Sequence, residues 1–145
     1  NYFLDDGAYL VTKIIIKMAA LRKEGKDLED LLAPLKEPAE AAEVRLPILA
    51  QDFRARGAEL IAALEETARE KGWAIAPDNR EGLRVSFPAG EGDGWFLLRL
   101  SVHDPILPLN MESSVPGGVK LIAEKLKEFF RTHSEGVDIS PIQQF

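Results

Sequence analysis

Three runs of alternating apolar and polar residues decide the fold: Leu83-Arg84-Val85-Ser86-Phe87, Gly94-Trp95-Phe96-Leu97-Leu98-Arg99-Leu100-Ser101 and Ile106-Leu107-Pro108-Leu109-Asn110-Met111-Glu112. Alternation with a period of two is the pattern of a strand that buries one face and exposes the other. The connection between the first two runs is short, and a short connection implies antiparallel pairing. The sequence therefore predicts an antiparallel sheet with one buried face.

A further strand and two helices complete this region. Apolar residues alternate with polar ones over 43–48, which predicts a strand, and Pro47 indicates that it lies at an edge. Helical spacing of apolar residues predicts helices over about 51–71, with Gly72 as its stop, and over about 117–131. The order strand, helix, strands, helix predicts an α+β domain, a mainly antiparallel sheet with two helices on one face.

The N-terminal region has a different character. A helix is predicted over 7–23, with Asp5 or Asp6 as its cap and Gly25 as its stop, followed by a short helix over 28–32. The run 7–21 is apolar nearly all round, as in helices buried inside larger proteins, and too short to span a bilayer. We therefore expect residues 1–38 to be a helical remnant of another domain, cut from a longer chain, and residues 39–145 to form the C-terminal domain.

Composition and charge limit the possible functions. The chain has 145 residues, a formal net charge of −6, two histidines and no cysteine. An acidic balance opposes a broad nucleic-acid surface, although it leaves room for one local anion site. The missing cysteines exclude disulfides, thiolate zinc sites and cysteine nucleophiles. No nucleic acid and no membrane is expected as a partner.

The segment Arg99-Leu100-Ser101-Val102-His103-Asp104-Pro105 is the sharpest candidate site. If the strand extends to Ser101, then Arg99, Ser101 and His103 lie on the face opposite the core. An arginine fork, a hydroxyl and turning backbone amides suit a phosphate dianion. Spacing alone favours the alternative, a solvated arginine and an ordinary turn. A hydrolytic triad of Ser101, His103 and Asp104 is disfavoured because residues this close in one extended segment rarely converge.

Other motifs have structural explanations. The glycines at 90, 92 and 94 lie between two strands, so a flexible hairpin loop is expected rather than a phosphate cradle. Ser114 precedes the last helix and is expected to cap it, although an anion at that helix end is the alternative. Asp5 and Asp6 are read as a helix cap rather than a cation site, and His133 as a favourable charge at a helix C-terminus.

A set of short motifs runs along almost the whole chain. They are Tyr2-Phe3, Asp5-Asp6-Gly7-Ala8, Gly25-Lys26-Asp27-Leu28, Leu31-Leu32, Gly82-Leu83-Arg84-Val85, Gly94-Trp95, Arg99 to Pro105, and Met111-Glu112-Ser113. In this order they resemble the end of the third domain and the fourth domain of the α-D-phosphohexomutases, the phosphoglucomutase and phosphomannomutase family. The resemblance implies a TATA-box-protein-like fold for the fourth domain.

The resemblance also implies roles for residues of the loop. In the family, the segment matching 99–105 is usually Arg-Pro-Ser-(Gly/Asn)-Thr-Glu-Pro and binds phosphate. Arg99, Ser101 and Pro105 keep this pattern, whereas the other positions depart from it. The resemblance therefore implies that Arg99 and Ser101 hold the non-transferring phosphate of the substrate, with His103 helping through its side chain or amide and Val102 through its backbone.

For the whole enzyme, the resemblance implies a phosphotransferase of the isomerase class that interconverts hexose 1-phosphate and hexose 6-phosphate through a phosphoserine, with Mg²⁺. The catalytic serine segment, the aspartate-rich metal loop and the sugar-recognition motif are absent from this chain, so we expect it to contain no catalytic residue or metal site and to be inactive alone. Its expected partners are the hexose phosphate and the remaining domains of the same enzyme, in the cytoplasm or, alternatively, the plastid stroma. The rival interpretation is a stand-alone anion-binding or structural interaction domain without catalysis.

Overall fold

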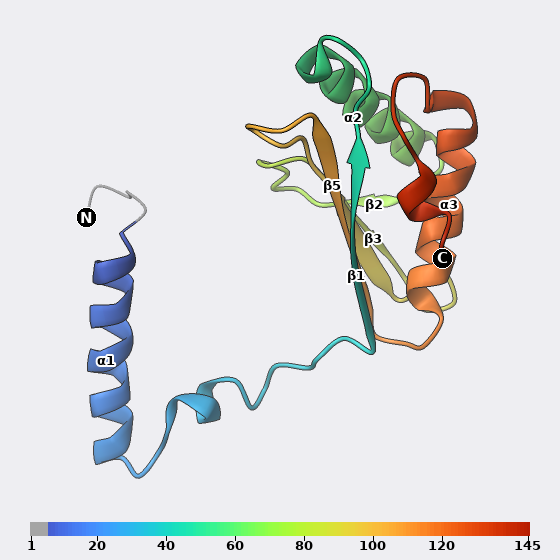
Figure 1. The fold of residues 1–145 in the computed structure, drawn as a ribbon. Helices are drawn as coiled ribbons and strands as arrows, with labels where there is room; N and C mark the ends of the chain where they lie inside the picture. Colours follow the sequence, from blue (N-terminus) through green and yellow to red (C-terminus); the bar gives the residue numbers. More distant parts are fainter. Residues whose placement is uncertain (1–5) are drawn as a thin grey trace. The chain divides into compact units, whose positions relative to one another are not determined.

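The computed structural model describes residues 6–145. It divides the chain into two compact units, one ending at Glu37 and the other beginning at Pro38 (Figure 1). Asp5, the alternative helix cap, and the Tyr2-Phe3 motif lie outside the described residues. The interpretation of the first unit as a remnant of another domain stays a prediction.

The first unit contains the helix α1, Gly7–Lys23, and a 3₁₀ helix, Leu28–Leu31. The Asp6 carboxylate accepts a hydrogen bond from the backbone N–H of Tyr9 at 3.0 Å, which caps α1 as the sequence predicts for this residue. Gly25 follows the helix with a φ of +72°, a conformation that glycine adopts without steric cost.

Most apolar side chains of α1 face solvent. Leu21 is buried, whereas Leu10 and Ile16 remain 60% and 61% exposed. Helices of globular proteins normally bury their apolar side chains, because burial of apolar surface is the main driving force for packing. The exposed apolar surface of α1 departs from this pattern. Over residues 6–145, no helix combines the length and the apolar character needed to cross a membrane.

The second unit is built on a five-stranded, fully antiparallel sheet in the order β1-β5-β4-β3-β2. The strands are β1 (Glu40–Pro47), β2 (Ala74–Ile75), β3 (Leu83–Phe87), β4 (Gly94–Leu98) and β5 (Ile106–Ser113). β1 lies at an edge, as Pro47 indicates. The short strand β2 was not predicted, because two residues give no readable alternation.

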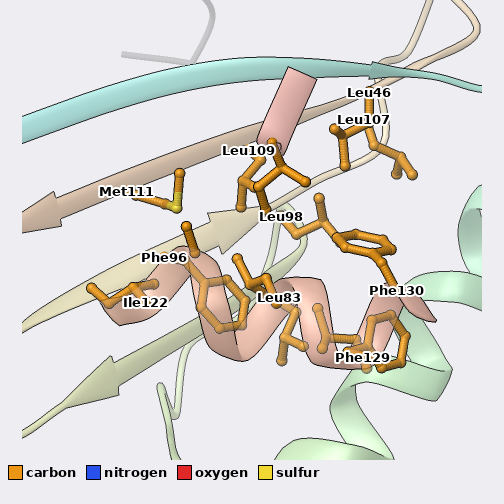
Figure 2. Packing of buried hydrophobic residues seen from close by; sticks show 14 of the residues in the cluster. Leu46, Leu83, Phe96, Leu98, Leu107, Leu109, Met111, Ile122, Phe129 and Phe130 are labelled. Carbon is orange, nitrogen blue, oxygen red and sulfur yellow. The ribbon is translucent and has the colours of Figure 1, made fainter. Parts of the chain in front are cut away.

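Two helices, α2 (Phe53–Glu70) and α3 (Gly118–His133), cover one face of the sheet (Figure 1). Alternate strand residues such as Leu83, Phe96, Leu98 and Leu109 have at most 1% of their surface exposed and pack against these helices (Figure 2). Apolar area removed from water on this scale is the main favourable term in folding. The predicted α+β class, with helices on one face of an antiparallel sheet, is confirmed.

The N-terminus of α3 corrects one prediction. Gly117 is the cap residue, with a φ of +80°, and Ser114 does not cap the helix. Instead the Glu40 carboxylate of β1 accepts hydrogen bonds from the backbone N–H groups of Gly117 at 2.7 Å and Val119 at 3.0 Å. The carboxylate thus supplies the negative charge that a helix N-terminus favours, and these bonds hold the pKa of Glu40 below its usual range.

The β3–β4 connection is a hairpin loop, as predicted, and it packs against α3. An added Cβ at Gly92 would lie 2.8 Å from a side-chain carbon of Ile122. Ser113, which is buried, donates from its hydroxyl to the Gly92 carbonyl at 2.5 Å. These contacts hold the loop against α3, and it joins two strands rather than opening a helix, as a phosphate cradle would.

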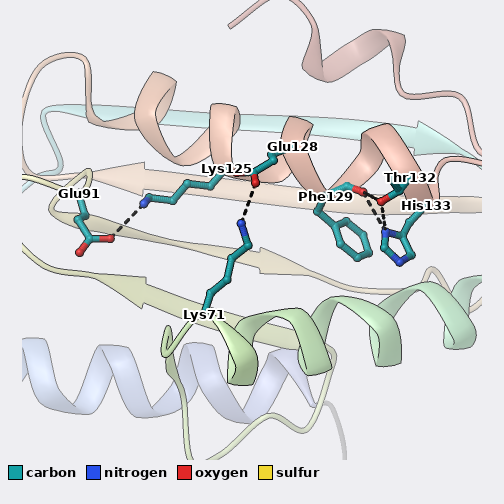
Figure 3. A network of polar contacts seen from close by, with 7 residues as sticks. All are labelled: Lys71, Glu91, Lys125, Glu128, Phe129, Thr132 and His133. Atoms are coloured by element: carbon teal, nitrogen blue, oxygen red, sulfur yellow. Dashed lines mark hydrogen bonds and ion pairs between the residues drawn. The ribbon is translucent and has the colours of Figure 1, made fainter.

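Ion pairs and a histidine line one side of α3 (Figure 3). Lys71, at the end of α2, pairs with Glu128 at 2.9 Å, and Lys125 pairs with Glu91 of the hairpin loop at 3.0 Å. His133 ends α3, where its Nδ1 lies 3.0 Å from the Phe129 carbonyl and its ring stacks on the Phe129 ring. Its place at the helix C-terminus is the one that the sequence predicts.

Two leucines of α3, one buried and one exposed, allow a test of the hydrophobic core. Leu126 is fully buried, whereas Leu121 is 48% exposed on the same helix. We expect Leu126→Ala to lower the free energy of unfolding by about 2–5 kcal/mol, because it removes buried methyl groups and leaves a cavity. Leu121→Ala is the matched control and should change it by less than about 1 kcal/mol. Urea unfolding followed by the fluorescence of Trp73 and Trp95 measures both, and equal losses would contradict the assigned core.

Glu40→Gln tests the carboxylate cap of α3. Because folding lowers the pKa of Glu40, the carboxylate stabilises the fold above the glutamate pKa of the unfolded chain and loses this effect as pH falls through the folded pKa. We expect the variant to be less stable than the wild type at pH 7, with the difference shrinking below about pH 4. Urea unfolding across this range measures it, with Glu70→Gln as an exposed control. A difference that does not depend on pH would contradict the cap.

Candidate functional site

The predicted site lies in the loop between β4 and β5. The sequence predicted a strand as far as Ser101, but β4 ends at Leu98 and Arg99 to Pro105 form a loop. Partial pairing with β5 continues, since the N–H of Arg99 donates to the Pro108 carbonyl and that of Ser101 to the Ile106 carbonyl, both at 3.1 Å. The strand prediction was therefore wrong at its end, although the alternation of faces extends to Leu100.

The loop turns through a hydrogen bond of its own. The hydroxyl oxygen of Ser101 accepts a bond from the backbone N–H of Asp104 at 3.2 Å, and the N–H of Ile106 donates to the Asp104 carbonyl at 2.8 Å. Such side-chain to backbone bonds are the usual reason that serine favours turns over strands. The Ser101 side chain therefore shapes the loop.

Besides its two hydrogen bonds to β5, the loop makes three contacts with other parts of the second unit. The side chain of Leu100 packs over Gly57 of α2, where an added Cβ would lie 2.5 Å from Leu100 Cδ1. The Pro105 carbonyl accepts a bond from the N–H of Ile48 at 2.7 Å. Arg54 of α2 donates from Nη2 to the Val102 carbonyl at 3.1 Å. The loop is thereby fixed against the first turns of α2.

The predicted site residues are therefore neighbours on one loop, with different surroundings. Arg99 and His103 are exposed, and Val102 is 71% exposed, whereas Ser101 is half-buried. Within residues 6–145, the Arg99 guanidinium makes no hydrogen bond or ion pair, and the N–H groups of Val102 and His103 have no acceptor. These groups remain available to an anion, and their role in binding one stays a prediction.

A hydrolytic triad is not assembled at this loop. Ser101 contacts the backbone N–H of Asp104 and not its carboxylate. Within the described part of the chain, the His103 ring has no hydrogen bond to Ser101 or Asp104. A nucleophile needs a base within hydrogen-bond reach, so this loop cannot activate Ser101 by the usual mechanism.

Glu43 and Arg45 lie on the face of the sheet that α2 and α3 do not cover, and Arg99 is close enough to act on the pKa of Glu43. Glu43 accepts hydrogen bonds from Arg45 at 3.2 Å and from Asn110 at 3.3 Å, and these bonds hold the pKa of Glu43 below its usual range. The positive charge of Arg99 also lowers the pKa of Glu43. The Glu43 carboxylate is thus hydrogen-bonded to Arg45 and Asn110, and within residues 6–145 the Arg99 guanidinium makes no hydrogen bond to it.

Arg54 was not predicted as part of the site. In the sequence, Arg54 is simply a polar residue in the first turn of a predicted helix. Val102, whose carbonyl it binds, follows 48 residues later. Helical periodicity shows which face a residue occupies but not which distant loop it meets. As for metals, residues 6–145 contain no group of three or more histidine, aspartate or glutamate side chains arranged to hold a metal ion.

Comparison with solved structures finds chains of similar fold. The chain resembles, with a TM-score of 0.62, the X-ray crystal structure of a phosphoglucomutase/phosphomannomutase family protein from Burkholderia thailandensis. The sequences are 22% identical, and the match covers 95% of this chain but only 26% of that protein. No protein-family profile and no curated protein matches this chain. The likeness shows the fold of this chain.

A substitution at Gly82 tests the close packing at the start of the β4–β5 loop. Its φ is +153°, and an added Cβ would lie 2.3 Å from the Leu98 carbonyl oxygen and 2.8 Å from the Arg99 Cα. We expect Gly82→Ala to lower the free energy of unfolding by roughly 1–3 kcal/mol, because backbone atoms must move to admit the methyl group. Gly90→Ala, with a φ of +85° but open space around it, is the control. Urea unfolding measures both, and a smaller loss at Gly82 than at Gly90 would contradict this packing.

Proposed function

We propose that this chain is the C-terminal part of a phosphohexomutase, and that its loop 99–103 clamps the non-transferring phosphate of a hexose phosphate. The observation that carries the proposal is the structural likeness to a phosphoglucomutase/phosphomannomutase family protein over 95% of this chain. The sequence motifs lead to the same family independently of the fold. Because the chain spans about a quarter of that protein's length, activity belongs to the proposed whole enzyme.

The geometry of the loop supports phosphate binding. A phosphate dianion accepts several hydrogen bonds, and arginine presents N–H donors in a planar fork that matches it. Arg99 offers such a fork at an exposed position, and the N–H groups of Val102 and His103 lie on the same short loop. Charge-assisted bonds of this kind are about twice as strong as neutral ones.

Clamping a phosphate away from the reacting atoms contributes to catalysis through orientation. Binding energy from a remote group can hold the sugar in a reactive position and reduce the entropy lost in the transition state. In the proposed enzyme, the phosphoserine and Mg²⁺ belong to the domains beyond this chain. Residues 6–145 then bind and orient the substrate and do not carry the phosphoryl group.

The exposed apolar surface of α1 fits a place inside a larger protein. Side chains such as Leu10 and Ile16, which are more than half exposed, would be buried by packing against the remaining domains. The rival, an independent anion-binding domain without catalysis, would leave this surface in water. The sequence upstream of Asn1 separates the two: a serine loop and an aspartate-rich loop in the same reading frame support the mutase.

Arg99→Ala tests the proposed clamp. We expect the wild-type chain to bind glucose 6-phosphate or inorganic phosphate weakly, with amide shifts in the loop 99–103, and Arg99→Ala to weaken this binding by roughly tenfold or more. The loss follows from removing the guanidinium donors of the loop. NMR titration of the labelled chain measures the dissociation constant.

Arg69→Ala is the matched control for net charge, because Arg69 lies on α2 and pairs there with Glu65 and Glu66. It should leave the loop response unchanged. In the full-length enzyme, Arg99→Ala should lower kcat/KM strongly while the fold survives. Equal binding by wild type and Arg99→Ala, or unchanged kinetics in the full-length variant, would contradict the role given to Arg99.

A further inference from the structure

The peptide group between Val102 and His103 is held from the side of α2. Arg54 lies in the first turn of α2, and its Nη2 donates to the Val102 carbonyl at 3.1 Å. This bond joins two segments 48 residues apart in the sequence. It is the one side-chain hydrogen bond, among residues 6–145, from outside the loop to a backbone atom of the loop.

The geometry of the peptide bond fixes where the other end of this group points. The chain has no cis peptide bond in its described part. In a trans peptide the C=O and the following N–H point in opposite directions. Because the Val102 carbonyl is directed at Arg54, the N–H of His103 is directed away from α2, and it has no acceptor within residues 6–145.

The charge on Arg54 also strengthens this N–H as a donor. A cation that binds a carbonyl oxygen polarises the whole peptide group, and hydrogen bonds in a chain reinforce one another. Arg54 makes no ion pair with a carboxylate among the described residues, so its charge is not neutralised by a direct acidic partner. Its guanidinium lies 4.8 Å from the centre of the Phe53 ring, within the range of a cation–π contact.

The rest of the loop is fixed independently of Arg54. Leu100 packs over Gly57, and Ser101 accepts the bond from Asp104. These contacts set the two ends of the turn. At the tip, where Val102 is 71% exposed, the bond from Arg54 is the side-chain hydrogen bond that the peptide receives within residues 6–145. Removing that bond should leave the fold intact and free this peptide to rotate.

We propose that Arg54 is a positioning residue for anion binding: it orients the Val102–His103 peptide so that the N–H of His103 donates to a phosphate dianion held by Arg99. This inference rests on the proposed phosphate clamp and adds a residue to it from a different element. It assigns the His103 contribution to the backbone amide, and it explains why a loop with valine and histidine at its tip can still present an ordered donor.

Arg54→Ala and Arg54→Lys test this role in the labelled chain, with inorganic phosphate and glucose 6-phosphate as the probes. We expect Arg54→Ala to weaken binding by roughly three- to tenfold, the effect of one hydrogen bond, and to reduce the shift of the His103 amide on saturation. The Arg99 signals should still respond. Arg54→Lys, whose ammonium can donate to the same carbonyl, should restore much of the His103 response.

A measurement without ligand tests the same role separately. Amide relaxation should show greater mobility at Val102 and His103 in Arg54→Ala than in the wild type, with Leu100 unchanged. Equal amide mobility in Arg54→Ala and the wild type would overturn the inference while leaving the clamp intact. So would an unchanged dissociation constant together with a His103 amide shift as large as that of the wild type. Weaker binding with a full His103 shift would overturn it too, because Arg54 would then contact the anion itself. A wild type that does not respond to millimolar anion would overturn the proposed function and this inference with it.

Discussion

Burial of one face of the sheet is the interaction on which the second unit depends. The alternation in β3, β4 and β5 places apolar side chains on the same face, and α2 and α3 exclude water from it. Side chains such as Phe96 and Leu109 have no exposed surface. Because the side-chain period of a strand is two, a shift of the register by one residue would expose this whole set. The register fixes in turn which residues of the β4–β5 loop face the helices.

The candidate site follows from that alternation. Leu100 continues the inward-facing series beyond the end of β4 and packs over Gly57, so the loop is anchored in the same core. Arg99 is then directed to the open side, and the tip at Val102 lies within reach of Arg54. A site built in this way has an exposed cation and backbone donors on a segment fixed at its base, which is the arrangement needed to hold an anion without a large loss of entropy on binding.

The sequence predicted the elements whose signals are local and missed the contacts that join distant segments. Strong periodicity predicted α2, α3 and the strands that form the core, and the proline of β1 indicated an edge. The cap of α3 was predicted wrongly because Glu40 lies 77 residues from Gly117 and no local pattern connects them. The end of β4 was overestimated because Leu100 keeps the alternation although the backbone has begun to turn. Arg54 was missed for the same reason as Glu40: its partner is distant in the sequence. The packing of α2 on the sheet brings Arg54 close to Val102.

The proposed role of the loop from Arg99 to His103 is to bind a phosphate group. A crystal structure of the chain with glucose 6-phosphate tests it most directly. We predict that the phosphate lies within hydrogen-bond distance of the Arg99 guanidinium and the His103 N–H, with Arg54 still bonded to the Val102 carbonyl. A phosphate bound elsewhere on the chain, or a loop left empty at saturating ligand, would contradict the account.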